Sequence, residues 1–326
     1  TAKVYPQSLL TLAETAGGVA DGLADAGFVV FPYAPAEFSE LNLPANLSLL
    51  STSGDVPEMP GAAMTGATME YVLLNCPDCL EQMKGLNHVY LSGASTPPYE
   101  LLCNKKISTA EEIDGTRLRA GAANWTRWAE YMGGTPVSMP GNDTYDAVSQ
   151  GLVDCTMNAV GDLLGLRYID IVTHITLKAP GGVFSGLSGA SFNRDTWQGL
   201  SNEERAVVIR ASARLAAEAI VSYEQDDAES LEAAKASGTV SIHEADEALL
   251  SKSAEFVNGD LATISEQFSN SFNVADTDAK IQTFGGLLDK WKGLTMEIGL
   301  DGTDDLDELY WNEIFSKLDP ETYAMD

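Results

Sequence analysis

Apolar and polar positions along residues 113–158 predict strands and helices in alternation. The apolar runs favour strands over residues 118–120, 136–139 and 152–157, and the amphipathic stretches between them favour helices over residues 125–132 and 145–150. Asp114-Gly115 is typical of a turn before the first strand, and Gly133-Gly134 is a stop signal after the first helix. The predicted order is βαβαβ, and ligands of open α/β sheets bind beyond the carboxyl ends of such strands.

Two polar side chains lie at those carboxyl ends. Arg119 belongs to the first strand and Asn158 directly follows the third. A planar guanidinium matches a carboxylate with two parallel hydrogen bonds, so Arg119 is a candidate carboxylate clamp. Arg117 has the same strand parity but lies about 6.6 Å further from the carboxyl end. Taken alone, a strand-end arginine is more often a surface salt bridge, and a strand-end asparagine often caps a turn.

The rest of the chain divides into an α/β region and a helical region. Before residue 113 we expect helices over residues 61–74 and 77–84 and strands over 28–31, 87–92 and 100–103. A strand over 169–177 and a glycine-rich loop over 179–186 follow the βαβαβ unit. From Ser201-Asn202-Glu203-Glu204, a helix-capping pattern, the chain is predicted to be helical. A long amphipathic helix comes first, then helices over residues 244–258, 260–268, 276–295 and 304–317.

Composition excludes several functions. The 326 residues carry a formal net charge of -29, which excludes nucleic acid as a partner because phosphate binding needs a positive patch. An anionic ligand would need a local pocket made by a few Arg or Lys side chains. No apolar run approaches the roughly 20 residues of a membrane helix. His88, His174 and His243 are far apart in sequence and form no catalytic or metal-binding motif, so we expect no enzyme, cofactor or metal.

The βαβαβ stretch resembles the solute-binding proteins of TRAP transporters, the DctP-like family. The motifs that carry the resemblance are EEIDGTRLR at 111–119, GTPVSMP at 134–140 and YDAVSQGLVD at 145–154. The family's substrate-clamping arginine falls on Arg119, and its binding-site asparagine falls on Asn158. Cys155 stands where the family has glycine.

The resemblance extends over nearly the whole chain. Further matches lie at residues 4–28, 33–38, 43–44, 193–201, 290–291 and 309–314. The start, residues 4–28, is similar to the family's strand–helix–strand, and family members carry a further strand and helix before Val4. The implied fold is α/β: a two-lobed periplasmic-binding-protein fold with a cleft between the lobes and a long lobe-spanning helix. The implied domains are lobe I at 1–104, lobe II at 105–200, and at 201–326 the long helix with C-terminal helices packing on both lobes.

The resemblance also implies a function. The protein is expected to be periplasmic and monomeric, to bind a small organic acid between two closing lobes, and to deliver it to the membrane subunits of a TRAP-type secondary transporter. Two alternatives stay open, a substrate-binding protein of an ABC-type importer and a ligand-sensing domain.

Further ligand contacts are implied by position in the family. Tyr33 and Glu37 fall in a first-lobe loop that contacts ligand, and Tyr99 lies near another ligand-facing position. Trp125, Tyr145 and Phe184 are candidates for aromatic side chains that line the cleft together, although each has core or lobe packing as its alternative. If two of the three line the cleft, a flat aromatic or cyclic carboxylate fits the site.

Four cysteines are present, as a Cys76-Pro77-Asp78-Cys79 motif and as Cys103 and Cys155. Such a motif suggests redox chemistry or metal binding in a cytosolic enzyme, but a zinc site would need a second pair of ligands. An even number of cysteines in an exported protein favours disulfides. Of the three possible connectivities we favour Cys76–Cys79 with Cys103–Cys155, and free buried thiols remain the alternative.

Overall fold

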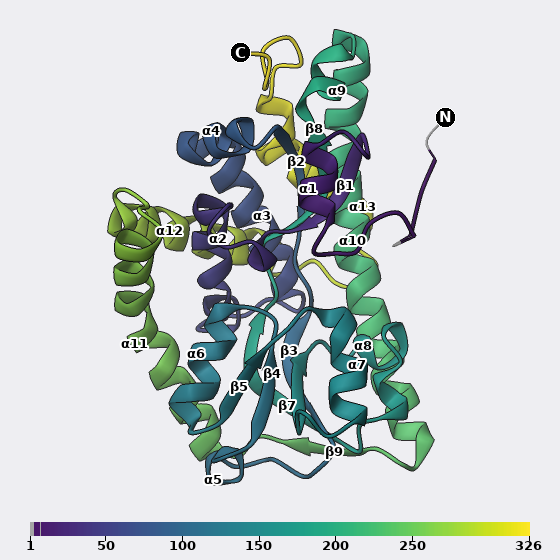
Figure 1. Ribbon diagram of the computed structural model, residues 1–326, viewed down its shortest axis with the longest axis vertical. Coiled ribbons are helices and arrows are strands. Elements are labelled where there is room, and N and C mark those ends of the chain that lie inside the picture. Colours follow the sequence, from purple (N-terminus) through teal and green to yellow (C-terminus); the bar gives the residue numbers. More distant parts are fainter. Residues whose placement is uncertain (1–2, 7) are drawn as a thin grey trace.

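The computed structural model describes residues 3–6 and 8–326, and its strands form two separate sheets (Figure 1). The smaller sheet has the order β1-β8-β2, from strands Ala26–Val30, Leu187–Asn193 and His88–Ala94. The larger sheet has the order β5-β4-β6-β3-β7-β9, from strands Thr135–Ser138, Arg117–Ala120, Cys155–Asn158, Pro98–Cys103, His174–Val183 and Ser241–Glu244. β4 runs parallel to β5 and β6, which brings the carboxyl ends of these three strands to one edge.

Helices around the smaller sheet enclose one hydrophobic core. They are α1 (Thr15–Ala20), α2 (Ser39–Asn46), α3 (Pro60–Glu70), α4 (Pro77–Gly85) and α9 (Arg194–Gly199). Two helices from the end of the chain, α12 (Thr277–Thr295) and α13 (Thr303–Glu313), return to this part. Phe31, Trp197, Trp291 and Tyr310 are among the side chains that fill the core.

The larger sheet separates two apolar clusters, as the two-residue period of a strand requires. Leu118 and Ala120 of β4 face the cluster that contains Trp128 of α6 (Ala123–Met132). Leu102 of β3 faces the other cluster, with Val148 of α7 (Gly141–Ser149). Two short helices, α5 (Ala110–Ile113) and α8 (Asp162–Gly165), complete this part.

Two long helices connect the parts. α10 (Asn202–Ser237) begins at a capping box formed by Ser201 and Glu204, ends at left-handed Gly238, and runs along the full length of the molecule in Figure 1. α11 (Glu247–Ser271) packs on β7 and α6 at one end and on α2 and α12 at the other. The long helix predicted from Ser201 therefore spans both sheets.

The chain crosses between the sheets at two neighbouring places. One crossing leads from β2 to β3, through residues 95–97, and the other leads from β7 to β8, through residues 184–186. The two segments are hydrogen-bonded to each other, with Thr96 N–H donating to the Phe184 carbonyl at 2.9 Å and Phe184 N–H donating to Thr96 Oγ1 at 3.0 Å. This paired connection links the two sheets beside the aromatic side chain of Phe184.

Several predicted elements differ in the structure. Residues 4–6 form no strand, and Val4 is 81% exposed. Only residues 184–186 of the predicted glycine-rich loop lie outside a strand, because β7 continues to Val183 through an irregularity in its pairing with β3. Gly182 is required there, since its φ is +71° and a Cβ would lie 2.7 Å from Leu49 Cδ2. The two helices predicted over 244–258 and 260–268 are the single helix α11, and the short strand β9 precedes it.

Both favoured cysteine pairs form disulfides. Cys103–Cys155 joins residues that face each other on β3 and β6, and Cys76–Cys79 closes the start of α4, where Cys76 Sγ accepts the N–H of Cys79. The part of the chain that the structure describes holds no free cysteine. Within residues 3–6 and 8–326, no helix has the length and apolar character needed to cross a bilayer.

Candidate ligand site

Arg119 is the centre of the site. Its side chain leaves β4 on the face opposite Leu118 and Ala120, and the residue is only 1% exposed. Nε and Nη2 donate to the Met139 carbonyl at 3.1 and 2.9 Å, and Nη1 donates to Asn158 Oδ1 at 3.0 Å. The two acceptors of these three bonds are neutral oxygens, and further N–H groups remain on the terminal nitrogens. The buried guanidinium is therefore fixed in place by bonds that do not neutralise its charge.

Arg117 has a different environment two residues earlier. Its side chain is 44% exposed and makes a bidentate ion pair with Asp154, at 2.7 Å between Nη2 and Oδ1 and 3.1 Å between Nε and Oδ2. This is the surface salt bridge expected of an ordinary strand arginine. The two arginines of β4 therefore differ: Arg117 is paired at the surface, and Arg119 is buried nearer the carboxyl end of the strand.

Asn158 ends β6 and joins Arg119 to an acid that the sequence analysis missed. While Oδ1 accepts from Arg119, Nδ2 donates to Asp162 Oδ2 at 2.7 Å, and the Thr156 hydroxyl also donates to Oδ1. Burial raises the pKa of Asp162, against the lowering effects of the Asn158 hydrogen bond and of the Arg119 charge. No local motif marks Asp162, because its role depends on α8 beginning four residues after Asn158.

Three of the candidate aromatic residues form one buried group, called here the aromatic wall: Tyr99, Trp125 and Phe184. Tyr99 stacks on Trp125 with ring centroids 4.5 Å apart, and Phe184 is parallel to Trp125 within 5° at 5.7 Å. Trp125 Nε1 donates to the Gly181 carbonyl at 3.3 Å, which fixes the indole. Burial raises the pKa of the Tyr99 phenol well above its ordinary value, and the positive charge of Arg119 partly opposes this.

Tyr33 brings the smaller-sheet part into contact with the Arg119 region. It ends the short helix η1 (Phe31–Tyr33), and its hydroxyl accepts the N–H of Gly141, at the start of α7, at 2.9 Å. Tyr168 donates to the carbonyl of the same glycine at 3.1 Å. A Cβ on Gly141 would lie 3.7 Å from the Tyr33 hydroxyl and 3.9 Å from Arg119 Nη2, so both groups lie beside Gly141.

Two of the predicted ligand contacts, Glu37 and Tyr145, do not join the group of residues around Arg119. Glu37 is exposed in the turn before α2. Tyr145 is partly buried and packs against the apolar cluster that includes Val148 and Leu163. Among the described residues, neither makes a hydrogen bond or ring contact with Arg119, Asn158 or the aromatic wall.

Two cavities lie elsewhere. One of about 560 Å³ lies between residues 49–54, the β3 and β7 strands and α11. Its lining includes Glu100, whose pKa is raised strongly by burial. The other, of about 190 Å³, lies between α4, β2 and the C-terminal residues. Neither is lined by Arg119, Asn158 or the aromatic wall, so the cavities and the arginine site are separate.

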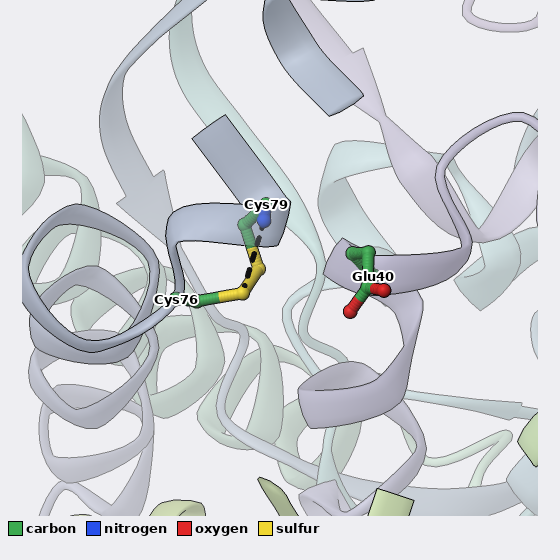
Figure 2. Close-up of side chains that lie close together, drawn as sticks. All are labelled: Glu40, Cys76 and Cys79. Carbon is green, nitrogen blue, oxygen red and sulfur yellow. Dashed lines mark hydrogen bonds between the residues drawn. A yellow bond between two sulfur atoms is a disulfide. The ribbon is translucent and has the colours of Figure 1, made fainter. Parts of the chain in front are cut away.

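The cysteine motif is close to one carboxylate, as Figure 2 shows for Glu40, Cys76 and Cys79. Their potential ligand atoms lie within 4.8 Å of one another. Because the two sulfurs are bonded to each other, neither is a thiolate, and Glu40 is engaged in an ion pair with Lys280 at 2.8 Å. This grouping is a disulfide beside a salt bridge.

The histidines have structural partners. His88 bridges Ser191 Oγ at 2.8 Å and the Ala16 carbonyl at 3.0 Å, and burial lowers its pKa. His174 and His243, distant in sequence, lie on adjacent strands with ring nitrogens 2.9 Å apart. Burial, and then the His174 charge, lower the pKa of His243.

Two sheets joined by a paired crossing, with a buried arginine at the strand ends where the parts meet, define a solute-binding protein. The model of the bacterial extracellular solute-binding protein family 7, DctP, matches residues 76–266. The chain belongs to this family, whose members are the extracytoplasmic solute-binding proteins of TRAP transporters and are not enzymes.

Solved structures of such proteins share the fold. A TRAP periplasmic solute-binding protein from Bordetella bronchiseptica, with bound (R)- and (S)-mandelate, is 21% identical over 89% of this chain and 88% of that chain, with a TM-score of 0.72. A marine metagenome TRAP solute-binding protein specific for aromatic acid ligands, in complex with metahydroxyphenylacetate, is 21% identical over 89% and 87%, at 0.70. A Bordetella pertussis extracytoplasmic solute receptor binding pyroglutamic acid is 19% identical over 86% of each chain, at 0.65.

Proposed function

We propose that this protein binds a small organic acid through Arg119, between two lobes that close on it, and delivers the acid to the membrane subunits of a TRAP transporter. The lobes in this proposal are the parts built around the smaller and the larger sheet, and the active unit is a single chain. The observation that carries the proposal is the guanidinium of Arg119, 1% exposed and hydrogen-bonded only to neutral oxygens among the described residues.

The energetics of a buried charge favour an anionic ligand. An unpaired buried charge costs several kcal/mol, and a carboxylate removes that cost by accepting two parallel N–H bonds from the guanidinium. The net charge of -29 repels anions at long range, so the attraction must be local, as Arg119 provides. The acids named for the three similar structures, mandelate, metahydroxyphenylacetate and pyroglutamic acid, support a carboxylate as the recognised group.

Contacts between the two proposed lobes support closure. Tyr33 of one lobe accepts from Gly141 of the other beside Arg119, and Arg127 of α6 reaches Asp260 of α11 at 2.7 Å and Asn46 of α2 at 3.1 Å. A carboxylate that relieves the charge of Arg119 in the closed form, but not in the open form, would shift the population toward closure. The closed, loaded form is then the one that docks on the membrane subunits.

A thermal-shift screen tests binding. Organic acids should raise the unfolding temperature, and the matching amides should not, because an amide carries no charge for Arg119. A ligand at about a hundred times its Kd adds about 2.7 kcal/mol to the free energy of unfolding, which is readily measured. Stabilisation by uncharged or cationic compounds alone would contradict the proposal. Delivery is tested by uptake into vesicles carrying the membrane subunits, which should require the binding protein.

A further inference from the structure

Gly121 lies between Arg119 and the aromatic wall. A Cβ atom built on Gly121 would lie 3.1 Å from Arg119 Nη1, 3.1 Å from Arg119 Nη2 and 3.1 Å from Phe184 Cε2. Since one point is equally close to all three atoms, Phe184 Cε2 is no further from either nitrogen than twice that distance. Glycine is the residue that lets the guanidinium and the ring edge approach each other so closely.

This closeness limits the ligand that can use both groups. A carboxylate oxygen accepts from a guanidinium nitrogen at about 2.7–2.9 Å, so an atom bonded to the carboxyl carbon begins roughly 5 Å from that nitrogen. Phe184 Cε2 lies no further than about 6 Å from the same guanidinium nitrogens. A ring attached to the carboxyl carbon, directly or through one carbon, therefore meets the wall as soon as its carboxylate meets Arg119.

The groups beside the wall disfavour a second carboxylate. Asp162 and the hydroxyls of Tyr33 and Tyr168 are the groups, besides Arg119, that act electrostatically on Tyr99. None of these is cationic. A ligand with one carboxylate and an otherwise uncharged body is the better match, because a second carboxylate would face Asp162.

We propose that the acid bound through Arg119 is an aromatic monocarboxylate, with its ring on the carboxyl carbon or one carbon away. Its ring lies against Phe184 and the aromatic wall, and Gly121 is the residue that makes the joint contact with Arg119 possible. This proposal rests on the proposed function, since it needs Arg119 to bind the carboxylate.

The test is titration calorimetry with four probes: benzoate, phenylacetate, cyclohexanecarboxylate and hexanoate. It compares the natural protein with Phe184→Leu and Gly121→Ala. Gly85→Ala is the matched control, because a Cβ at Gly85 meets nothing within 4 Å and its backbone is not left-handed. Unfolding temperatures without ligand verify that each variant is folded.

Benzoate or phenylacetate should bind about 2- to 10-fold more tightly than hexanoate and cyclohexanecarboxylate. Phe184→Leu should weaken the aromatic acids by about 2- to 10-fold, the range of a stacked pair, and leave hexanoate unchanged. Gly121→Ala should weaken every acid, because its methyl group presses on the guanidinium and the ring edge together, and Gly85→Ala should change nothing.

Three outcomes would overturn the proposal. Equal affinity for hexanoate and benzoate, with no effect of Phe184→Leu, would show that the wall does not select the ligand, while the carboxylate clamp would stand. Cyclohexanecarboxylate binding as tightly as benzoate would show recognition of ring shape and not of aromatic character. Failure of all four carboxylates to bind would exclude the aromatic acid, and the thermal-shift screen of other organic acids would then decide separately whether the proposed function stands.

Discussion

Asn158 binds Arg119 and Asp162 at the same time, accepting from Nη1 of the arginine at 3.0 Å and donating to Oδ2 of the acid at 2.7 Å. An amide can do this because it has an acceptor and a donor on one planar group. Asp162 fixes which way the amide points, and the amide presents a neutral oxygen to the guanidinium. Asn158 therefore holds Arg119 in place without consuming its charge.

Exchanging the amide of Asn158 for a carboxylate should weaken ligand binding more than removing it. Asn158→Ala deletes one hydrogen bond to a charged group, about 1.5–3 kcal/mol, and should weaken binding by roughly 10- to 100-fold. Asn158→Asp gives Arg119 a permanent internal partner that competes with the ligand, so its loss should be larger. Titration calorimetry on both variants measures the difference, and equal affinities would contradict the positioning role of Asn158.

Removing the Tyr33 hydroxyl should weaken closure. Tyr33→Phe deletes the hydrogen bond from Gly141 N–H, about 0.5–1.5 kcal/mol, so the Kd of the ligand should rise by roughly 2- to 12-fold. Tyr131→Phe is the control, because Tyr131 is 40% exposed on α6 and packs beside Phe256 and Lys252, away from the proposed ligand-binding residues. If Tyr33→Phe and Tyr131→Phe bind the ligand equally, the hydroxyl has no part in closure.

The carboxyl groups of Glu224 and Asp227 should make the protein less stable as pH rises from about 4.5 to 8. Burial, and then the charges of Asp227 and Glu58, raise the pKa of Glu224 on α10 from 4.5 to about 8, and burial raises that of Asp227 to about 6. In this window the folded protein keeps protons that the unfolded chain has released, so the free energy of unfolding decreases with pH. Above about pH 8 both states have lost these protons and the decrease ends.

Glu224→Gln should flatten this pH dependence, since glutamine does not titrate. The exposed Glu229 on the same helix provides the control, as Glu229→Gln should leave the profile of the natural protein unchanged. Thermal unfolding at pH 5, 6, 7 and 8 measures both. A Glu224→Gln profile as steep as the natural one would show that this carboxyl does not titrate in the window.

Local pattern predicted the elements that position the clamp. The stretch from β4 to β6 has short apolar strands, a glycine stop after α6 and amphipathic helices, so its order could be predicted. The ion pair of Arg117 with Asp154 fits the choice of Arg119, which stays a prediction. Asp162 could not, since a partly buried acid on a short helix has no sequence signal. Nor could the extension of β7 through Gly181 and Gly182, because glycines with positive φ are typical of loops. Here the close approach of Thr52 to Gly181 and of Leu49 to Gly182 accounts for them.

The grouping of the aromatic residues could not be predicted from the sequence either. Trp125, Tyr99 and Phe184 come from three different elements, and their stacking depends on the crossing that brings residue 184 beside residue 96. Tyr145, an equal candidate by sequence, packs instead into the apolar cluster under α7. Helical position alone did not distinguish Trp125 from Tyr145, because each lies near the start of a helix at the same sheet edge.

The most direct test of the central claim is the affinity of one bound carboxylate, measured by titration calorimetry, for Arg119→Lys, Arg119→Ala and Arg117→Ala. The Arg117 variant is the matched control, since it loses an arginine from the same strand together with an ion pair to Asp154. We predict that Arg119→Ala abolishes measurable binding, that Arg119→Lys weakens it by 10-fold or more because the planar fork is lost, and that Arg117→Ala binds as the natural protein does. Undiminished binding by Arg119→Ala would contradict the account.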